Sequence, residues 1–422
     1  MQDDRYSTVG ISSAATSGPP TPNTVPYFRS RRVEKGEIQT PRMSKKKGMT
    51  RESWLWINPV LGLIGGLGVA GALIYTKYQQ VIPHHDYCAV LNEDFSSGQL
   101  DRGVWTPEIQ VNGFGNGEFD ETTDSPTNLF ILNNQLHIRP TLQDAALITN
   151  NNIINLTQAG TCTSPLWSSC VASTNTTNGT IVPPARSARI NTKKGANIKY
   201  GRVEVRAKMP KGDWLWPAIW MLPTDNAYGA WPASGEIDIA ESRGNNHSYW
   251  NGKGGNDFAV STLHWGPDTD YDAYWRTTKA NQASHSEYGD KFHTYGLEWT
   301  KDYLFTYIDS RLRQVLYVPF VKKTMWEKGD FPASDHNGSR IADPWSQTGN
   351  KNTPFDQYFH IMLNVAVGGT NGWFPDGIDS KPWADASQTA RRDFWAAKDQ
   401  WYPTWQESNE MVVDSVKMWQ QC

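Results

Sequence analysis

The sequence has no large excess of charge of either sign, few cysteines and few long stretches of helical periodicity. Its formal net charge of -3 gives no basic surplus of the kind that points to nucleic acid. Its cysteines include no CxxC pair, which argues against a zinc site. Neither an internal repeat nor a strong heptad pattern occurs, so a repeat protein or a coiled coil does not fit. With 422 residues and 38% hydrophobic content, the chain can still bury a full core.

The chain is rich in tryptophan, glycine and short alternating segments. Its 20 Trp and 35 Gly indicate short strands and turns, with aromatic faces suited to flat polar ligands such as sugar rings. Alternating runs recur, each bounded by Gly, Pro, Asn or Asp: QLHIRP, YGRVEVRAKMP, GEIDIAE, YGLEWTKDYLFTYIDSRL, QYFHIMLNVAVGG and MVVDSVKMW. The pattern predicts an all-β fold, an antiparallel β-sandwich of two sheets.

One segment, residues 53–76, carries no charge at all. As a helix it is long enough to cross a bilayer core of about 30 Å. Trp54, Trp56 and Tyr75 lie at its ends, where membrane spans carry aromatic belts. It is too long and too far from the N-terminus for an ordinary cleaved signal peptide. A buried helix of a soluble domain is the alternative, but the glycine-rich, charge-free run favours one transmembrane signal anchor.

Basic residues lie mainly before this segment. The lysine run at 45–47 and Arg51 precede it, whereas only Lys77 follows closely. The positive-inside rule therefore places residues 1–52 in the cytosol and the rest of the chain outside it. The prediction is a single-pass type II membrane protein whose main domain is extracytoplasmic, in the secretory pathway or at the cell surface.

Composition divides the chain further. Residues 1–52 are rich in Ser, Thr, Pro and basic residues and have almost no apolar periodicity, so we expect a disordered tail. Residues 77–88 form a short stalk. Residues 89–422 contain no break in composition and are expected to form one domain, with a long polar excursion at 141–185.

Two features agree with an extracytoplasmic domain. The five N-x-S/T sequons all follow the span, at Asn155, Asn175, Asn178, Asn246 and Asn337. The four cysteines follow it too, on the side where disulfides persist. Four cysteines allow three pairings, of which we favour Cys162 with Cys170 inside one loop and Cys88 with Cys422 at the two ends of the domain.

The segment GEIDIAES contains three acids, Glu236, Asp238 and Glu241, and the last is out of step with strand alternation. On a regular strand Glu241 would face the core beside the two isoleucines, where an unpaired carboxylate is costly. A β-bulge at Ile239 or Ala240 would return it to the face of the other two acids. The spacing therefore predicts a bulge at this point.

Paired carboxylates on one face are suited to glycosidic bond cleavage. Two Glu side chains that lean toward each other can approach about 5–5.5 Å, the separation found in retaining glycosidases. Mutual repulsion through the intervening Asp would help to keep one acid protonated. A solvated acidic strand is the alternative. A metal site is a third reading, disfavoured because no His or further Asp lies at ligand spacing in the sequence nearby.

The residues just upstream favour the catalytic reading. Trp214, Trp216, Trp220 and Trp231 lie in a segment that is also broken by prolines. Some of these rings must belong to the core, because an inward-facing Trp is ordinary packing. Four so close together cannot all be buried on one face. We therefore expect at least two to line a cleft, where flat rings stack on pyranose sugars.

Several motifs together resemble glycoside hydrolase family 16. They are SARI, YGRVEVRAKMPKGDWLWPAIWMLP, WPASGEIDIAESRGN, STLHWGP, YGLEWT and NVAVGGTNGWFPD. The resemblance is closest to the laminarinases, which are endo-1,3-β-glucanases, and to the related β-1,3-glucan recognition proteins. It extends from about Glu93 to Lys417 and includes GTCTSPLWSSC. A lone ExDxxE would be weak, but the ordered set is specific.

The resemblance implies a β-jelly-roll sandwich with a concave glycan-binding cleft and a retaining mechanism. It implies that Glu236 is the nucleophile, Glu241 the general acid/base and Asp238 the residue that orients Glu236. It also implies sugar contacts for Trp220, Trp231, His264, Arg189 and Trp373. Each contact has a plainer alternative: a core histidine, an Arg paired with an acid, or a Trp that covers a loop. Asn364 is expected to brace a strand or the cleft floor.

The family resemblance also bears on cofactors and setting. No cofactor is required, although some members carry a structural calcium ion on the convex side, to which Glu93 and Asp414 would contribute. The expected partners are a β-glucan polysaccharide and, through one transmembrane helix, a membrane. The anchor departs from a simple secreted laminarinase and is similar to membrane-bound fungal members thought to remodel wall glucan.

Three readings of function remain open from the sequence. The first is a retaining hydrolase of β-1,3-glucan, or of mixed or branched β-glucan, with a transglycosylase of wall glucan as its near neighbour. The second is a non-catalytic β-glucan receptor. Recognition members of this branch have typically lost catalytic acids, whereas this chain keeps all three. The third is a scaffold for wall synthesis.

Overall fold

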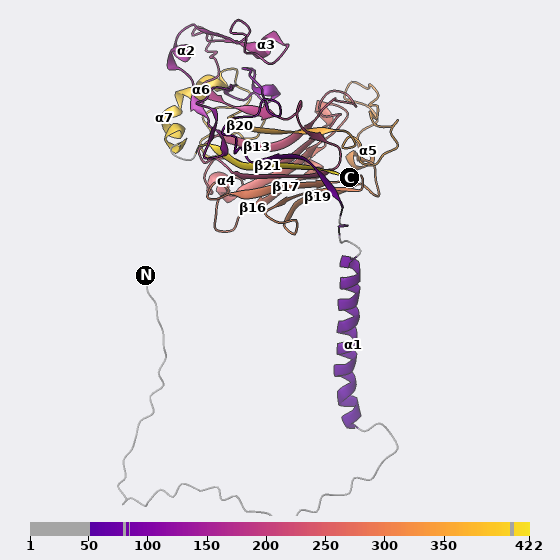
Figure 1. Cartoon of the computed structure of the whole chain (residues 1–422). Coiled ribbons are helices and arrows are strands. Elements are labelled where there is room, and N and C mark those ends of the chain that lie inside the picture. The colour runs from indigo at the N-terminus through magenta and orange to yellow at the C-terminus, as the bar shows by residue number, and fades with distance from the viewer. Residues whose placement is uncertain (1–50, 79–81, 84, 406–408) are drawn as a thin grey trace, which may run out of the picture. The chain divides into compact units, whose positions relative to one another are not determined.

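The computed structural model describes residues 51–78, 82–83, 85–405 and 409–422. These residues fall into two separate units, Met1–Pro83 and His84–Cys422, drawn in Figure 1. The predicted tail lies outside the described residues except for its last two positions, which belong to the first helix. The first strand of the second unit begins at Tyr87, slightly before the predicted start of the domain at residue 89.

The described part of the first unit is a single helix, α1 (Arg51–Tyr78). Its segment Trp54–Thr76 has a mean hydropathy of 1.9 and none of it is buried within the structure. By length and composition this helix is able to cross a membrane. It contains the predicted span.

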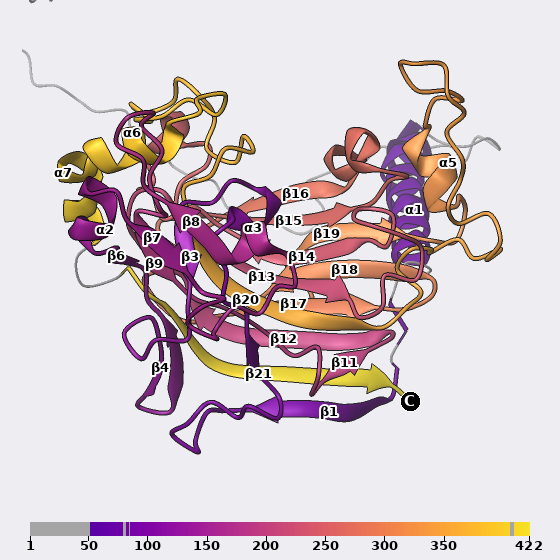
Figure 2. The same cartoon turned by 90° about the horizontal axis from the view of Figure 1, so that it is seen from above.

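The second unit is built on two large antiparallel sheets that form a jelly-roll sandwich, seen from above in Figure 2. In the first sheet β1 pairs with β21, and the strand order is β19 (Gln314–Pro319), β18 (Tyr303–Ile308), β17 (His293–Trp299), β12 (Gly201–Lys208), β21 (Met411–Gln421), β5 (Gln135–Ile138), β4 (Leu129–Leu132). The remaining strand, β1, spans Tyr87–Glu93.

The second sheet carries the predicted site. Its order is β16 (Thr278–Gln282), β15 (Phe258–His264), β14 (Glu236–Glu241), β13 (Leu215–Pro223), β20 (Phe359–Val367), β10 (Arg189–Asn191), β2 (Thr106–Pro107). The short β11 (Asn197–Ile198) also pairs with β20. The central strands β13 and β20 are almost wholly buried, so both of their faces are covered.

Alternation explains which side chains enter the core. In β12, Val203, Val205 and Ala207 are buried, while the Arg and Glu residues between them are less so. From the second sheet, Ile237 and Ile239 join the same apolar cluster. Burying one such aliphatic side chain contributes about 1.5–3 kcal/mol. The sandwich core therefore fixes the sheet whose opposite face carries the acids.

Smaller elements border the sandwich. Two small sheets contain β3 (Asp120–Thr122), β9 (Ala185–Ser187), β6 (Thr141–Leu142), β7 (Ile153–Asn155) and β8 (Val171–Ser173). The short helices are α2 (Ala145–Thr149), α3 (Trp167–Cys170), α4 (Tyr249–Gly252), α5 (Met325–Gly329), α6 (Ala390–Ala396) and α7 (Lys398–Trp401). The 3-10 turns are η1 (Gly113–Gly115), η2 (Thr269–Tyr271), η3 (Tyr274–Thr277) and η4 (Tyr402–Trp405). In both views α2, α6 and α7 gather at one end of the domain and α5 lies at the other.

Both predicted disulfides form. Cys162 bonds to Cys170 within the polar excursion, and Cys88 bonds to Cys422, which joins β1 to the end of β21. Ile154 and Leu156 of the excursion belong to a small apolar cluster that also includes Ile109 and Val111. The predicted pairing is therefore confirmed.

Candidate active site

The register of β14 contains the predicted bulge. Opposite β13, Ala240 pairs with Ile219 and Asp238 pairs with Trp220, so Ile239 has no partner. The pairing with β15 shifts over the same interval. The extra residue lets Ile239 enter the core while Glu241 leaves it. The prediction drawn from the out-of-step acid is confirmed.

Cross-strand pairing gathers the predicted residues from distant parts of the chain. Glu236 lies opposite His264 on β15, and Asp238 lies opposite Trp220 on β13. One strand further on, Asn364 of β20 pairs with Arg189 of β10. These positions form a continuous patch on the sheet face that points away from the sandwich core.

Glu236 and Asp238 are linked by a side-chain hydrogen bond. The Trp231 indole Nε1–H donates to Glu236 Oε2 at 2.7 Å. The pKa of Asp238 is raised well above its ordinary value, first by burial and then by the charges of Glu236 and Glu241. A hydrogen bond with Glu236 acts in the same direction. Asp238 therefore holds its proton more strongly than an exposed Asp does, and it shares a hydrogen bond with Glu236.

Glu241 is held in a different state from Glu236. Burial raises its pKa to about 7, and the charge of Glu236 adds to that effect. His264, the indole N–H of Trp216 and Arg243 act in the opposite direction. The Trp216 Nε1–H donates to Glu241 Oε1 at 2.9 Å. A carboxyl group with a pKa near neutrality is suited to give up and take back a proton.

His264 lies between acids on two sides. Its Nε2 is 3.4 Å from Asp238 Oδ2, and its Nδ1 is 2.5 Å from Asp272 Oδ2. Burial by itself lowers the pKa of His264, but the hydrogen bond to Asp272 and the charges of Glu236, Asp272 and Glu241 outweigh burial and raise it to about 9. His264 therefore carries a positive charge at neutral pH beside the acids.

Arg189 and Trp220 contact each other beside the acids. The Arg189 guanidinium lies 4.7 Å from the Trp220 ring centroid and 3.9 Å from that of Phe114. Its Nε is 2.6 Å from Glu108 Oε2. The Trp220 Nε1–H donates to Asn364 Oδ1 at 2.7 Å. Arg189 is thus paired with an acid, the plainer reading of its role, and Asn364 is the expected brace.

Trp373 packs behind Glu241 rather than standing alone. Its ring stacks on Trp216, with centroids 4.9 Å apart, and the Arg243 guanidinium lies 4.1 Å from its centroid. Arg243 Nη2 also donates to the Trp373 carbonyl at 2.6 Å. These contacts place Trp373 one ring away from Glu241. Its stacking on a sugar stays a prediction.

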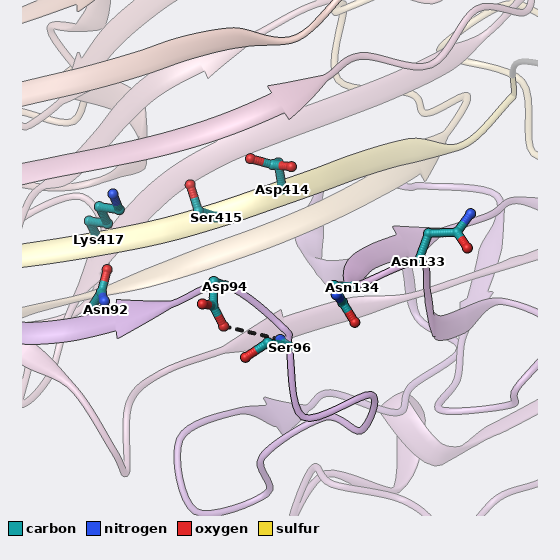
Figure 3. A pocket seen from close by; sticks show the side chains of 8 residues that line it. All are labelled: Asn92, Asp94, Ser96, Asn133, Asn134, Asp414, Ser415 and Lys417. Carbon is teal, nitrogen blue, oxygen red and sulfur yellow. Dashed lines mark hydrogen bonds between the residues drawn. The ribbon is translucent and has the colours of Figure 1, made fainter.

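The predicted calcium ligands do not converge. Asp414 Oδ2 pairs with Arg206 at 2.8 Å, its Oδ1 accepts from Gln135 at 3.1 Å, and Glu93 Oε1 accepts from the Phe95 amide at 2.9 Å. Asp414 lines an open polar pocket of about 490 Å³ between β1, β21 and the turn before β5, but Glu93 does not (Figure 3). The pair does not fit a calcium site, and we assign no role to an ion there.

A second set of metal-capable donors coincides with the acids. One oxygen each of Glu236 and Asp238 and one nitrogen of His264 lie within 4.8 Å of one another. The sequence argument against a metal missed this His, because β15 brings it in from outside the motif. Burial and the neighbouring acids raise the pKa of Asp238, and the acids raise that of His264 to about 9, so a metal would have to displace protons from these groups. We assign no metal to the site.

The sequence singled out Trp216 only as one of four closely spaced tryptophans, and it did not single out Arg243 or Asp272. Trp216 shares a strand face with Trp220, four residues on, so alternation along β13 was a usable signal. Arg243 follows the acid motif closely, and Asp272 lies in the turn after β15. Neither carries a local pattern that distinguishes it from an ordinary surface charge, because the partners of both are set by the tertiary fold.

A two-sheet sandwich with paired acids on an outward sheet face defines a jelly-roll protein with a glycosidase-type site. The chain belongs to family 16 of the glycosyl hydrolases, whose sequence profile, Glycosyl hydrolases family 16, matches residues 149–352. A β-1,3-glucan-binding protein of Penaeus monodon is 40% identical over 346 residues, which cover 79% of this chain and 90% of that protein. One from Tenebrio molitor is 32% identical and covers 78% of this chain. This chain spans 64% of that relative's length.

Solved structures agree on the fold. The laminarinase from Rhodothermus marinus superposes with a TM-score of 0.50 at 23% identity, over 81% of this chain and all of that one (100%). A non-specific endo-β-1,3(4)-glucanase of family 16, SCLam, has the same TM-score of 0.50 and 23% identity over 81% of this chain and 96% of its own. The relatives named above are animal proteins, so the fungal part of the resemblance gains no support.

Proposed function

We propose that this protein is a retaining β-glucan hydrolase that acts by double displacement. The observation that carries the proposal is the bulge in β14, which puts Glu236, Asp238 and Glu241 on one face of the sheet. The unequal states of the acids support it. Glu241 has a pKa of about 7, and the protonated Asp238 hydrogen-bonds to Glu236.

In the first step Glu236 attacks the anomeric carbon of the bound sugar and forms a glycosyl ester. The bond from that carbon to the glycosidic oxygen breaks, and Glu241 gives its proton to the departing oxygen. Trp231 donates to one oxygen of Glu236, which leaves the other oxygen for attack. The positive charge of His264 offsets the charge that remains among the acids.

In the second step Glu241, now a carboxylate, takes a proton from water. The resulting hydroxide attacks the anomeric carbon from the opposite side and breaks the ester to Glu236. Two inversions give net retention of configuration. A sugar hydroxyl in place of water would give transglycosylation, which the same two acids support.

The substrate class is β-1,3-glucan, alone or in mixed or branched chains. The relatives' names state that they bind β-1,3-glucan. Of the four tryptophans expected to supply cleft surface, Trp231 is exposed at 41% and offers an aromatic face at the acids, whereas the other three, Trp220 among them, are buried. Flat rings of this kind stack on the apolar faces of pyranoses.

The test compares turnover with binding in the full chain, purified in detergent. Glu236→Gln and Glu241→Gln are each assayed on laminarin, and binding to the same polymer is measured by sedimentation. We expect the Glu241 variant to lose about 10²–10⁴-fold in turnover and the Glu236 variant to fall to background, with binding retained in both. The Asp270→Asn variant, a change at an exposed acid near the site, is the matched control.

A non-catalytic β-glucan receptor is the second candidate, favoured by the names of the curated relatives. It predicts that the wild-type chain binds laminarin without releasing reducing ends from any β-glucan in a panel.

Labelled acceptor oligosaccharides decide between hydrolysis and transfer, because only transfer gives products longer than the donor.

We further propose that α1 anchors the protein as a type II membrane protein with the glucanase domain outside the cytosol. Support comes from the apolar segment of the helix and from the five sequons, four of which are exposed and one half-buried. Such an enzyme would act on glucan at the cell surface or in the secretory pathway. Sensitivity of the expressed protein to peptide N-glycosidase tests the orientation. In sealed microsomes we expect a glycosylated domain that is protected from protease and an N-terminal tail that is digested. An unglycosylated domain that the protease digests would contradict the proposal.

A further inference from the structure

The turn that follows β15 directs one acid at the imidazole of His264. Asp272 Oδ2 accepts from His264 Nδ1 at 2.5 Å. Its Oδ1 accepts from two backbone amides, those of Trp265 at 3.1 Å and Tyr274 at 3.2 Å. The Asp272 side chain is 8% exposed. Both carboxylate oxygens therefore accept hydrogen bonds, and these bonds hold the side chain in one orientation in the turn.

The rest of the imidazole is packed by aromatic rings. Tyr274 stacks on it with centroids 5.3 Å apart, and the Trp231 ring centroid lies at 5.5 Å. Between these rings only the two nitrogens have polar partners. Nδ1 faces Asp272, so Nε2 is left to face Asp238 Oδ2 at 3.4 Å.

We propose that Asp272 is a positioning residue of the reaction: it fixes the protonation and orientation of His264 so that the Nε2–H faces the Asp238–Glu236 pair. The proposal rests on the proposed function for its catalytic consequence. Asp272 does not touch the substrate in this account. It acts through His264, in the way that a carboxylate fixes the ring of a catalytic histidine.

Four acids among the described residues face His264. Glu236, Asp238 and Glu241 face it from β14, and Asp272 faces it from its own turn. Tyr274 is the titratable group stacked on the ring. A neutral residue at position 272 would remove the hydrogen bond and the charge that raise the pKa of His264. The pKa would fall, and the ring would lose its positive charge near neutral pH.

Loss of the positive charge on His264 would raise the pKa of Glu241. His264 lowers the pKa of Glu241 through its charge. Removing the charge therefore raises the pKa of Glu241, and the alkaline limb of kcat/KM, where the acid loses its proton, moves to higher pH. A side chain that only held the turn together would lower the plateau and leave the limb in place.

The test uses the full chain in detergent with Asp272→Asn as the main variant. NMR of histidine-labelled protein, with His264→Gln to assign the signal, follows the pKa of His264 directly. We expect the Asn variant to lower that pKa by about two units, into the neutral range, to reduce kcat/KM on laminarin by about 10-fold or more, and to shift the alkaline limb upward. Asp270→Asn, two residues away and exposed, should change none of the three.

A double variant tests whether Asp272 acts through His264. In a His264→Gln background, Asp272→Asn should cost no further activity, because the ring that it positions is gone. A further loss of 10-fold in that background would overturn the proposal. An unchanged pKa of His264 in Asp272→Asn would do so as well.

Two outcomes need separate handling. If Asp272→Asn does not fold, Asp272→Glu is measured instead. This variant keeps the charge but moves the oxygens by one methylene, so the pKa of His264 should stay raised while kcat falls. An unchanged kcat overturns the proposal. If the wild-type chain cleaves no β-glucan, the proposed function fails, whereas the titration of His264 still tests the action of Asp272 on the ring.

Discussion

At the scale of single residues, the site depends on acids that share a strand but differ in protonation. Asp238 keeps a proton because it is buried beside two other acids, and Glu241 titrates near pH 7 for the same first reason, burial. The hydrogen bond from Trp216 and the charges of His264 and Arg243 hold the pKa of Glu241 down. In the proposed mechanism, the balance among these groups sets the pH at which the enzyme works.

The first prediction concerns pH. Glu241 must be protonated for the first step, so kcat/KM should fall as pH rises through about 7, the pKa raised by burial. Initial rates on laminarin between pH 4 and 9 measure this limb. Activity that keeps rising above pH 8 would contradict the assignment of Glu241 as the acid.

Trp216→Phe provides a second, signed prediction. The variant keeps an aromatic ring against Trp373 but removes the N–H that donates to Glu241. Since that hydrogen bond lowers the pKa of Glu241, the pKa should rise and the alkaline limb should move to higher pH. Trp167→Phe, at an exposed ring far along the chain, is the control. A limb that moves to lower pH would contradict the claim that the hydrogen bond from Trp216 lowers the pKa of Glu241.

Residue-scale prediction from the sequence reached the acids but not their partners. The odd spacing of Glu241 was enough to predict its face, because burial of an unpaired carboxylate excludes the alternative. Asp272 and Arg243 could not be predicted, since the ring of His264 and the indole of Trp373 reach them only through folding.

At the scale of elements, β14 carries the functional geometry. Its bulge shifts one residue out of the ladder and changes the face of everything after it. The bulge follows from a conflict visible in the sequence, which is why it was predictable. The pairing of β14 with β13 and β15 places Trp220 and His264 beside the acids without any further local signal.

Strand parity gives an element-scale prediction. Deletion of Ala240 should leave Glu241 on the acid face of a regular strand, displaced along it, with turnover reduced by about 10²-fold. Insertion of one Ala after Ala240 also restores the parity of a regular strand but moves Glu241 further along it from Glu236, so turnover should fall at least as far. Rates on laminarin, with thermal unfolding as a check of folding, measure both. Activity of either variant equal to that of the wild type would contradict the role of the bulge.

At the scale of the whole molecule, the described domain is a sandwich tied at its ends by a disulfide. Alternating runs predicted the two sheets because each strand covers a core on one face. The strand order was not predictable, since β21 from the end of the chain lies between β12 and β5. The short strands β7 and β8 lie in polar sequence with no such pattern.

The two disulfides should differ in their effect on stability. Cys88 and Cys422 are separated by 334 residues, whereas Cys162 and Cys170 are separated by 8. A cross-link that closes a longer loop removes more entropy from the unfolded chain. Replacing Cys88 and Cys422 with Ser should lower the free energy of unfolding by about 4 kcal/mol, against about 2 kcal/mol for the other pair. Denaturant titrations in detergent measure both, and the reverse order would contradict this reasoning.

The central claim is that Glu236 forms a covalent bond to the sugar while Glu241 moves the proton. The most direct measurement is peptide mass spectrometry of the full chain after incubation with a 2-fluoro β-glucosyl fluoride of the laminaribiose type, which forms the ester but releases it slowly. The account predicts one added glycosyl mass on Glu236 and none in Glu236→Gln. A label on Glu241, or a bound sugar polymer with no label on either acid, would contradict it.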